Sequence, residues 1–399
     1  MLSGDRQTPV GEKGPFWAMQ QEFSRWFERI DVLCPRPDRE VRVRSICGNV
    51  FFHPADCSRL GMVGWLAREG KRLHAEHGHD LIVSHDYGWF YNGLAAARLT
   101  RATGVPYLSE IHHVPGVPRA ADRREVFDRF VAKRYIRWAR RRARAFRVVN
   151  RVQMPELLRS WGVEPEAICV LPSLYIDLAL FAPPAPRPEP EQDVLFVGRL
   201  VNNKGLFELV EALATLARRG RPLRALILGK GPLRAAVEQR VREHGLGDSV
   251  RFVEWLDSGG GLAELYAKSR LLVCASTCEG GPRVTVEAMA CGTPVVSTPV
   301  GVMGDLLADG RAGLLCGFGA DEIAAVIEQA LTDEENGRGR GPAAREVAER
   351  FEYAQILEGY ARGLHELVGL EARRRLGNED PVAGSAPSRV ASQTEEGGA

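Results

Sequence analysis

The chain has 399 residues, enough for two domains that each bury a hydrophobic core of their own. Its content of 45% hydrophobic and 26% charged residues is that of a soluble globular protein. No apolar run approaches the length of a membrane span, and the opening residues MLSGDRQTPVGEKG lack the charged start and apolar centre of a signal peptide. We therefore expect a cytoplasmic protein.

Eight cysteines are scattered along the chain, and Cys274 and Cys278 form their only close pair. No second pair with histidines accompanies these two, which argues against a zinc site and against a disulfide scaffold. Buried free thiols in a reducing compartment fit this pattern best, and we expect no metal.

The net charge of +2 is unevenly distributed. Residues 1–182 carry 28 Lys and Arg against 20 Asp and Glu, whereas residues 183–399 carry 25 against 31. The first part is therefore basic and the second acidic, which suggests that an anionic partner meets the first part.

The first residues are unusual, because only Met1 and Leu2 precede a glycine-containing stretch from Ser3 to Phe16. We expect Met1 and Leu2 to lie inside a first strand. The stretch that follows, with Gly11 and Gly14, would then lie at a cleft.

Short apolar strands alternate with helices from residue 80 to residue 182, and this alternation predicts a parallel sheet. The expected elements are strands at 80–85, 105–113, 146–150 and 167–173, with helices at 92–101 and 127–145. His85 ends one strand, and His112 and His113 end another. A histidine at the carboxyl end of a parallel strand faces the cleft in such folds.

The segment from Arg119 to Arg147 is strongly basic, with twelve Lys and Arg against three acids. Five large apolar residues form a partial stripe along it: Phe127, Phe130, Val131, Tyr135 and Trp138. This pattern favours an anionic membrane surface or a phosphorylated acceptor as the partner. The alternative is a solvated helix that packs its stripe on its own domain. No nucleic-acid recognition motif accompanies it.

A proline-rich segment, residues 183–192, is expected to link two domains. Beyond it the alternation of strands and helices resumes, with expected strands at 194–198, 224–231, 249–256, 270–276, 293–299 and 312–317. Two such halves predict two Rossmann-like, doubly wound α/β domains at 1–182 and 193–343, facing each other across a cleft.

The run VLFVGRLVNNKG combines a strand, a turn at Gly198, two cations and a helix start. Arg199 and Lys204 suit phosphate oxygens at the carboxyl edge of a parallel sheet. Downstream, the third glycine of a dinucleotide fingerprint is replaced by Arg234 in GKGPLR, which excludes a nicotinamide site and leaves Gly229 as a turn. Trp255 either stacks on a nucleobase or belongs to the core.

Glu279 and Glu287 stand eight positions apart in EGGPRVTVEAMACGTPVVSTPVG. Gly280 and Gly281 let the backbone approach a ligand closely, and a helix that begins after them favours a phosphate. The two carboxylates are acceptors for the hydroxyls of a sugar. Diphosphate next to sugar hydroxyls describes a nucleotide-sugar.

Together these motifs resemble the family-four retaining glycosyltransferases, whose fold, GT-B, consists of two Rossmann-like domains. The resemblance covers roughly residues 80–365. It implies that Arg199 and Lys204 neutralise the donor diphosphate, that Glu279 contacts the donor sugar and that Glu287 binds the ribose. The segment GVPYLSEIH matches the family at His112, which would contact the donor sugar or the reacting centre. His85 matches a second recurrent histidine more weakly.

The implied activity is a retaining glycosyltransferase of the hexosyltransferase type, which moves a sugar from a nucleoside diphosphate to a glycan, lipid-linked or small-molecule acceptor. Several relatives act on lipid-linked acceptors, which favours a peripheral position at the inner face of the membrane. A nucleotide-sugar epimerase and a non-catalytic sugar- or lipid-binding scaffold remain as alternatives. In the family the chain ends by crossing back onto the first domain, and the helical pattern at 344–370 resembles that crossover. Residues 371–399 are expected to be disordered.

Overall fold

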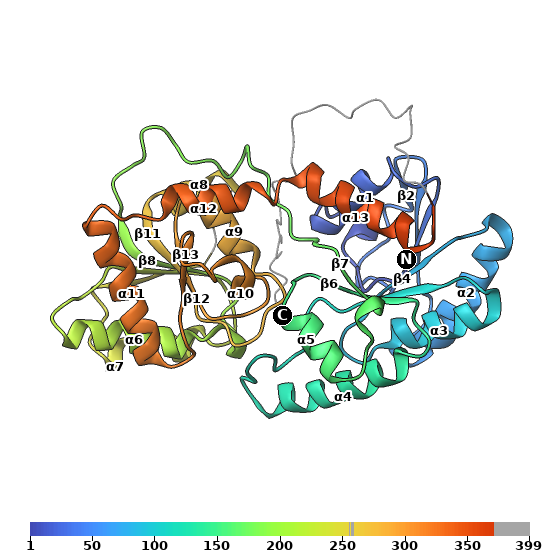
Figure 1. Cartoon of the computed structure of the whole chain (residues 1–399), viewed down its shortest axis with the longest axis horizontal. Helices are drawn as coiled ribbons and strands as arrows, with labels where there is room; N and C mark the ends of the chain where they lie inside the picture. Colours follow the sequence, from blue (N-terminus) through green and yellow to red (C-terminus); the bar gives the residue numbers. More distant parts are fainter. Residues whose placement is uncertain (255, 257–258, 371–399) are drawn as a thin grey trace, which may run out of the picture. The chain divides into compact units, whose positions relative to one another are not determined.

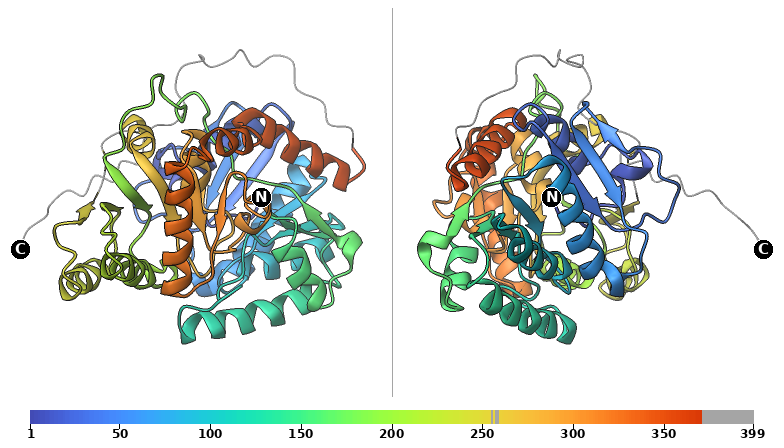
Figure 2. Two further views of the ribbon diagram at one scale, coloured as in Figure 1. Left: turned by 60° about the vertical axis from the view of Figure 1, so that its left-hand side comes forward. Right: turned by 90° about the vertical axis from the view of Figure 1, so that its right-hand side faces the viewer.

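The computed structural model describes residues 1–254, 256 and 259–370. It is a mixed α/β protein whose described residues divide into two compact units. Among the described residues, the first unit contains 1–86, 90–109 and 357–370, and the second contains the described residues of 87–89 and 110–356. Figure 1 gives the element labels, and Figure 2 shows the same ribbon from two further sides.

The first unit is built on a three-stranded sheet and on two further strands, with helices packed around them. Its elements are η1 (Thr8–Val10), α1 (Pro15–Phe23), β1 (Ile30–Cys34), β2 (Ser45–Ile46), β3 (Val50–Pro54), η2 (Arg59–Gly61), α2 (Met62–His77), β4 (Ile82–His85), α3 (Tyr91–Thr103) and β5 (Tyr107–Glu110), whose last residue falls in the second unit. The three-stranded sheet has the order β1-β3-β2, with β1 parallel and β2 antiparallel to β3.

Met1 and Leu2 extend this strand system. Leu2 is buried and forms two parallel bridges, one to Leu33 in β1 and one to Ser84 in β4. Its amide donates to the carbonyl of Val83 over 2.7 Å. Leu2 therefore lies between β1 and β4 as an isolated bridge, and no strand is assigned to Met1 and Leu2.

The second unit includes the helices and strands between β5 and the six-stranded sheet. It contains α4 (Arg123–Ala139), β6 (Ala145–Val148), α5 (Gln153–Ser160), η3 (Pro165–Ala167) and β7 (Ile168–Val170), with β6 parallel to β7. Asp122 caps α4, because its Oδ1 accepts from the amide of Glu125 over 2.9 Å. The helix therefore starts earlier than the apolar stripe from Phe127 predicts.

A six-stranded sheet forms the rest of this unit. Its strands are β8 (Gln192–Val197), β9 (Ala225–Leu228), β10 (Val250–Val253), β11 (Ser269–Cys274), β12 (Val295–Ser297) and β13 (Gly313–Leu315). They are parallel, in the order β10-β9-β8-β11-β12-β13. The connecting helices are η4 (Asn202–Lys204), α6 (Leu206–Arg218), α7 (Arg234–Glu243), α8 (Gly259–Ala267), α9 (Arg283–Ala290), α10 (Met303–Leu306) and α11 (Ala320–Glu335).

Alternate residues of the strands feed two cores on opposite faces of this sheet. Val194 and Phe196 pack with α6, α7 and α11, whereas Leu195 packs with α8, α9 and the later helix α12 (Gly341–Glu349). The same two groups of helices lie on either side of the strands in Figure 1. Buried parallel strands read as continuous apolar runs, and this is why all six strands could be predicted from the sequence.

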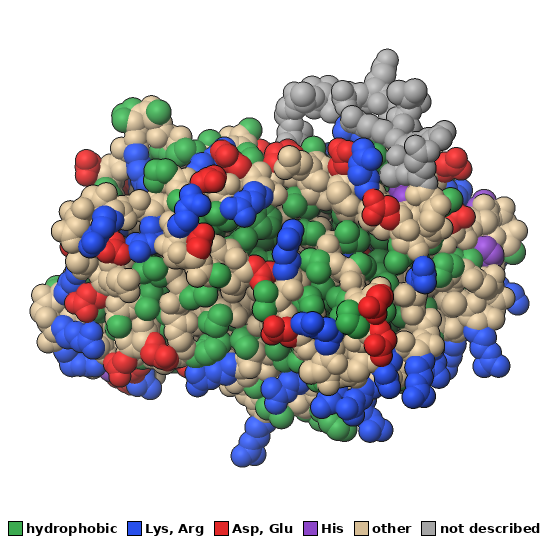
Figure 3. Space-filling model, in the orientation of Figure 1, with side chains coloured by type: hydrophobic (Ala, Val, Ile, Leu, Met, Phe, Trp, Pro, Cys, Tyr) green, Lys and Arg blue, Asp and Glu red, His purple; other side chains and the backbone are tan. Residues whose placement is uncertain are grey.

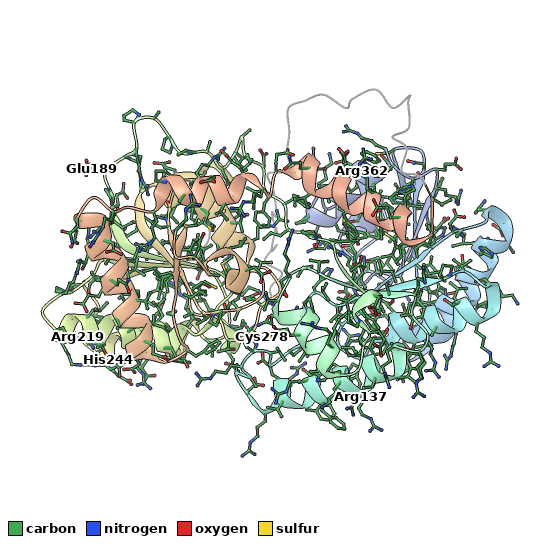
Figure 4. All side chains as sticks on the ribbon, in the orientation of Figure 1. Arg137, Glu189, Arg219, His244, Cys278 and Arg362 are labelled. Carbon is green, nitrogen blue, oxygen red and sulfur yellow. The ribbon has the colours of Figure 1, made fainter. Side chains whose placement is uncertain are left out.

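The predicted helix at 344–370 is two helices, α12 and α13 (Tyr353–Leu367). The chain breaks between them because Phe351 accepts a hydrogen bond from the amide of Ile176, and Glu352 forms a parallel bridge with the same residue. Within the first unit, α13 packs Tyr360 against Phe23 at a ring distance of 5.0 Å. It also places Arg362, labelled in Figure 4, over Trp26.

Two sequence-based expectations cannot be compared with the structure. Trp255 and the tail 371–399 lie outside the described residues. In the described part of the chain, no helix is both long enough and apolar enough to span a bilayer.

Candidate active site

The predicted donor residues lie where the strand order of the six-stranded sheet reverses. After β8, the chain places β9 and then β10 on one side of it, and afterwards β11, β12 and β13 on its other side. In open parallel sheets, ligands bind beyond the carboxyl ends of the two strands at such a reversal. Here these strands are β8 and β11, and the loops that follow them carry Arg199, Lys204 and Glu279.

Backbone contacts hold these two loops together. The amide of Thr277 donates to the carbonyl of Asn203 over 2.9 Å, and the Asn203 side chain donates to the carbonyl of Cys278 over 3.1 Å. Gly205 has a φ of 64°, and a Cβ added there would lie 2.0 Å from the carbonyl oxygen of Ala275. Only glycine permits this approach, which fixes the position of Lys204 one residue earlier.

Lys204 and Glu279 form an ion pair between the two loops. Ser276 Oγ donates to the same Glu279 oxygen over 3.2 Å. Both charged side chains are about one-sixth exposed, so solvent, or a ligand that replaces it, can reach them. The predicted cation and the predicted sugar-binding acid are thus neighbours, although 75 residues separate them in the sequence.

Arg199 lies in the same loop with an exposed side chain, directly after Gly198. Gly229 supports this turn from β9, because a Cβ there would lie 1.8 Å from the carbonyl oxygen of Gly198. The GKGPLR segment therefore packs against the loop that carries Arg199 and Lys204, which we call the cation loop. Its Arg234 donates to Glu238 within α7 over 2.7 Å.

Helix α9 begins directly after the Glu-Gly-Gly-Pro turn. Gly280 is buried and Pro282 occupies the N-cap, where it has no N–H to donate. The amide of Arg283 is the first donor of this helix, and the amides of Gly280 and Gly281 lie in the turn before it. The Arg283 side chain itself is engaged elsewhere, since Nη1 donates to the carbonyl of Tyr175 over 2.9 Å.

Glu287 lies one turn further along α9 and is only 6% exposed. The buried hydroxyl of Tyr266 donates to its Oε2 over 3.0 Å. Burial raises the pKa of the Glu287 carboxyl, and nearby Arg283 partly opposes that rise. Glu279 and Glu287 therefore differ in environment: the first is paired with a cation and the second is held by a neutral phenol.

His112 and His113 follow β5 with exposed side chains in the second unit. They reach the Glu279 loop, because a Cβ on Gly280 would lie 2.8 Å from the carbonyl oxygen of His112. Surrounding protein atoms lower the pKa of the His113 imidazole, and the attraction of Glu279 partly offsets this. Both expected histidines of this strand thus lie beside the expected donor residues.

The remaining predicted residues belong to the first unit. His85 ends β4, and its ring meets Phe16 edge-on at 5.8 Å. Gly14 is the N-cap of α1, and Gly11 ends η1 with a φ of 92°. Their roles as acceptor-side residues stay predictions.

Sequence reasoning missed three residues that complete the site. Ser276 contacts Glu279, Tyr266 contacts Glu287, and Arg147 contacts His112. Ser276 is three residues from Glu279 in a strand-end loop, a signal that could have been used. Tyr266 and Arg147 lie on other elements, so no local spacing points to them.

No group of three or more His, Cys, Asp or Glu side chains is arranged to hold a metal ion within residues 1–254, 256 and 259–370. The cysteines Cys274 and Cys278 are both buried free thiols. Cys278, labelled in Figure 4, points its Sγ at the carbonyl oxygen of Val114 over 3.2 Å.

Comparison with known proteins matches the two parts of the chain separately. Residues 181–347 match the family described as glycosyl transferases group 1, and residues 17–173 match the glycosyl transferase 4-like domain. Among solved structures, Anabaena HepE in complex with UDP and glucose aligns with a TM-score of 0.66 at 20% identity, over 92% of this chain and 98% of that one. That likeness supports the GT-B fold.

Two curated relatives have higher sequence identity. The 2-deoxystreptamine glucosyltransferase of Streptomyces kanamyceticus is 30% identical over 330 residues, which are 78% of this chain and 82% of the relative. The D-inositol 3-phosphate glycosyltransferase of Gordonia bronchialis is 29% identical over 332 residues, covering 77% of this chain and 65% of the relative. Both are named as transferases, so the epimerase alternative is not favoured. The chain belongs to the group 1 glycosyltransferases with a GT-B fold.

Proposed function

We propose that the protein transfers a glycosyl unit from a nucleoside diphosphate to a hydroxyl, with retention of anomeric configuration. The observation that carries this proposal is the meeting of Lys204 and Glu279 at the strand reversal between β8 and β11. A cation for the diphosphate and an acceptor for sugar hydroxyls stand side by side there. The start of α9 supplies backbone donors next to them.

The proposed chemistry follows from the charge that develops on the leaving group. When the glycosidic bond breaks, the diphosphate gains negative charge, and Lys204, Arg199 and the α9 amides are placed to stabilise it. Fixed cations do here what a metal ion does in other transferases, so no metal is required by this scheme. Glu287 accepts hydrogen bonds from the ribose hydroxyls in this proposal.

Retention is proposed to occur by attack on the face that the diphosphate leaves. Glu279 is held by Lys204 and Ser276, which favours a role in binding the sugar. A covalent intermediate on Glu279 is the alternative route to retention. Trapping with a fluorinated donor analogue and mass spectrometry separates the two routes.

For the donor, we propose a uridine nucleotide. Support comes from a structural neighbour, Anabaena HepE, whose structure holds UDP and glucose. UDP and UDP-glucose are therefore the first probes, with GDP and ADP and their sugars as comparators. A ligand at about a hundred times its dissociation constant adds roughly 2.7 kcal/mol of stability, which a thermal shift detects readily.

For the acceptor, we propose a lipid-linked molecule reached at an anionic membrane surface. The solvent-facing side of α4 carries Arg123, Phe127, Phe130, Arg134 and Arg137 in order, at helical spacing, and we call this set the outer stripe. Phe127 and Phe130 are more than half exposed. Apolar side chains among cations are the composition of helices that lie in the interface of an anionic bilayer.

A neighbouring loop enlarges this apolar area. Trp89 is 71% exposed, and its ring meets Phe127 edge-on at 6.3 Å. Tyr135, which the sequence suggested as part of the same apolar stripe, is instead buried on the inner side of α4. Figure 3 shows lysine and arginine side chains projecting along the edge where α4 runs in Figure 1, and Figure 4 shows Arg137 among them.

The donor proposal is tested by Lys204→Ala and Glu287→Ala. We expect both purified variants to fold and to bind UDP more weakly. Lys204→Ala should lower UDP release from UDP-glucose by about 10²- to 10³-fold, the usual loss for one charge-stabilising group, and Glu287→Ala should lower it through the lost contact to the ribose. Binding is measured by calorimetry and UDP release by a coupled assay. Arg251→Ala, which removes an exposed cation from β10, is the matched control.

Two results would overturn the proposal. The first is a wild-type rate and affinity in both variants. The second is an equal loss in Arg251→Ala, since a loss without regard to position would show that bulk charge and not the site binds the diphosphate.

A further inference from the structure

Beneath His112 lies an ion pair that the proposed reaction does not use. Arg147 in β6 is fully buried, and Glu110 at the end of β5 is 2% exposed. Arg147 Nη1 lies 3.2 Å from Glu110 Oε1, and Arg147 Nε donates to the carbonyl of Leu171 over 2.8 Å. Ionised groups are almost never fully buried unless they are paired, and a buried pair adds little to stability compared with apolar residues of the same volume.

The same guanidinium reaches the histidine ring. Arg147 Nη1 lies 3.2 Å from His112 Nε2, whereas Glu110 Oε2 lies 3.5 Å from that nitrogen. A guanidinium has donors and no acceptor, so the hydrogen bond to Nε2 exists only if this nitrogen carries a lone pair. In the neutral ring the proton then resides on Nδ1.

Glu110 makes this arrangement electrostatically acceptable. An arginine alone beside His112 would be a buried, uncompensated charge, and a carboxylate alone would attract a proton to Nε2. Together the pair is neutral, and the closer contact to Nε2 comes from the donor. Lysine would not serve equally, because the planar guanidinium holds three partners in fixed directions.

We infer that Glu110 and Arg147 are positioning residues that hold His112 in the neutral Nδ1–H tautomer. This inference rests on the proposed function, in which His112 contacts the donor sugar or the reacting centre. The tautomer makes His112 a hydrogen-bond donor through Nδ1 toward a sugar oxygen. The ring is about half exposed and adjoins the Gly280 turn, so a bound sugar can reach it.

A double variant separates positioning from folding. Glu110→Leu alone leaves a buried arginine without its counter-charge and is expected to lower the melting temperature. Adding Arg147→Met removes both charges and keeps apolar volume, and such exchanges are often neutral or stabilising. We therefore expect the double variant to melt close to the wild type and to bind UDP with a Kd within about twofold, while UDP release from UDP-glucose falls about tenfold or more.

The direct measurement is the tautomer of His112. Protein labelled with ¹⁵N-histidine gives separate ring signals for the protonated and unprotonated nitrogens, and His112→Gln assigns the signal among nine histidines. We expect Nδ1–H in the wild type and a mixture of tautomers in the double variant. Arg270→Met, which removes a mostly buried arginine from the start of β11, is the control that leaves the His112 signals unchanged.

Two outcomes overturn the inference: an Nε2–H tautomer in the wild type, or a double variant whose His112 signals and UDP release both match the wild type. Failure of the proposed function looks different, because it abolishes UDP binding by the wild type and leaves the tautomer measurement intact.

Discussion

The donor loops and helix α4 belong to the same unit and are built in opposite ways. At the donor loops, backbone meets backbone: a Cβ at Gly205 or Gly229 would lie 2.0 or 1.8 Å from a carbonyl oxygen. Along α4, the outer stripe places two exposed phenylalanines between arginines. In the first region, the close backbone contacts leave no space for a side chain at these two glycines. In the second region, the side chains face solvent and are not packed in this way.

This difference shows how each region constrains the sequence. The donor loops need glycine where two backbones approach closely. The glycines and the charged residues beside them therefore form a short sequence motif that can be recognised without the structure. Packing within the folded chain does not require particular side chains in the outer stripe. Its exposed hydrophobic side chains become stabilising only when a partner covers them. Substitutions of the donor-loop glycines should therefore damage folding, whereas substitutions in the outer stripe should damage binding.

The largest effect is expected for Gly229→Ala. The added methyl group cannot coexist with the carbonyl oxygen of Gly198, so β9 and the cation loop must move apart. We expect a loss of about 3 kcal/mol or more in the free energy of unfolding, the upper end of the range for overpacked sites. Chemical denaturation measures it.

The control for this substitution is Gly247→Ala. A Cβ at Gly247 meets no atom within 4 Å, so its effect should stay within about 0.5 kcal/mol. Equal stability of the two variants would mean that the loops are not packed against each other as described.

An intermediate effect is expected for Phe127→Ser combined with Phe130→Ser. Each fully buried phenylalanine contributes about 1.5–3 kcal/mol, and partial insertion into a bilayer uses part of this. We expect binding to vesicles of phosphatidylglycerol and phosphatidylcholine to weaken at least tenfold, with no change in melting temperature. Sedimentation with vesicles measures the bound fraction.

Two controls sharpen this test. Leu60→Ser replaces a residue that is 98% exposed on η2 and should leave vesicle binding unchanged. Raising the salt concentration should weaken binding by the wild type, because the arginines act through long-range charge. Binding that survives the double substitution, or a dimer that the substitution abolishes, would assign the apolar area to another partner.

Features that local sequence patterns encode were predicted, and features that only the fold brings together were not. The strands of the six-stranded sheet, the loop with Arg199 and Lys204, and both glutamates could be predicted, because apolar runs and glycine turns are local signals. The β1-β3-β2 sheet of the first unit was not predicted, because Asp31 interrupts the apolar run of β1 and β2 spans only Ser45–Ile46. Arg147 was interpreted as part of a basic surface segment, although it is fully buried. Only the fold brings it to Glu110 and His112.

The distinction between Glu279 and Glu287 could not be predicted for a similar reason. In the sequence they form a symmetrical pair around a turn. In the structure Glu279 faces Lys204, whereas Glu287 faces the buried Tyr266 hydroxyl, which a separate helix supplies. One glutamate therefore has a cation as its partner and the other a neutral phenol.

The smallest effect is expected for Glu287→Gln, and it depends on pH. Burial raises the pKa of Glu287 above its ordinary value of 4.5, so the unfolded chain releases this proton at a lower pH than the folded protein does. Below 4.5 both states are protonated and the group contributes no difference. As the pH rises through 4.5 and up to the raised pKa, the wild type loses stability, and above that pKa the loss stays constant.

Glutamine does not titrate, so the stability of Glu287→Gln relative to the wild type should increase across this window and then remain level. The Tyr266 hydroxyl can still donate to the amide oxygen, which keeps the local packing. Urea denaturation between pH 4 and pH 8 measures the difference, and Glu164→Gln, which changes an exposed glutamate just before η3, is measured beside it as the control. UDP affinity should fall in the same variant, because one carboxylate oxygen is lost. A relative stability that decreases with rising pH would mean that ionised Glu287 stabilises the fold, and the contrast drawn between the two glutamates would be wrong.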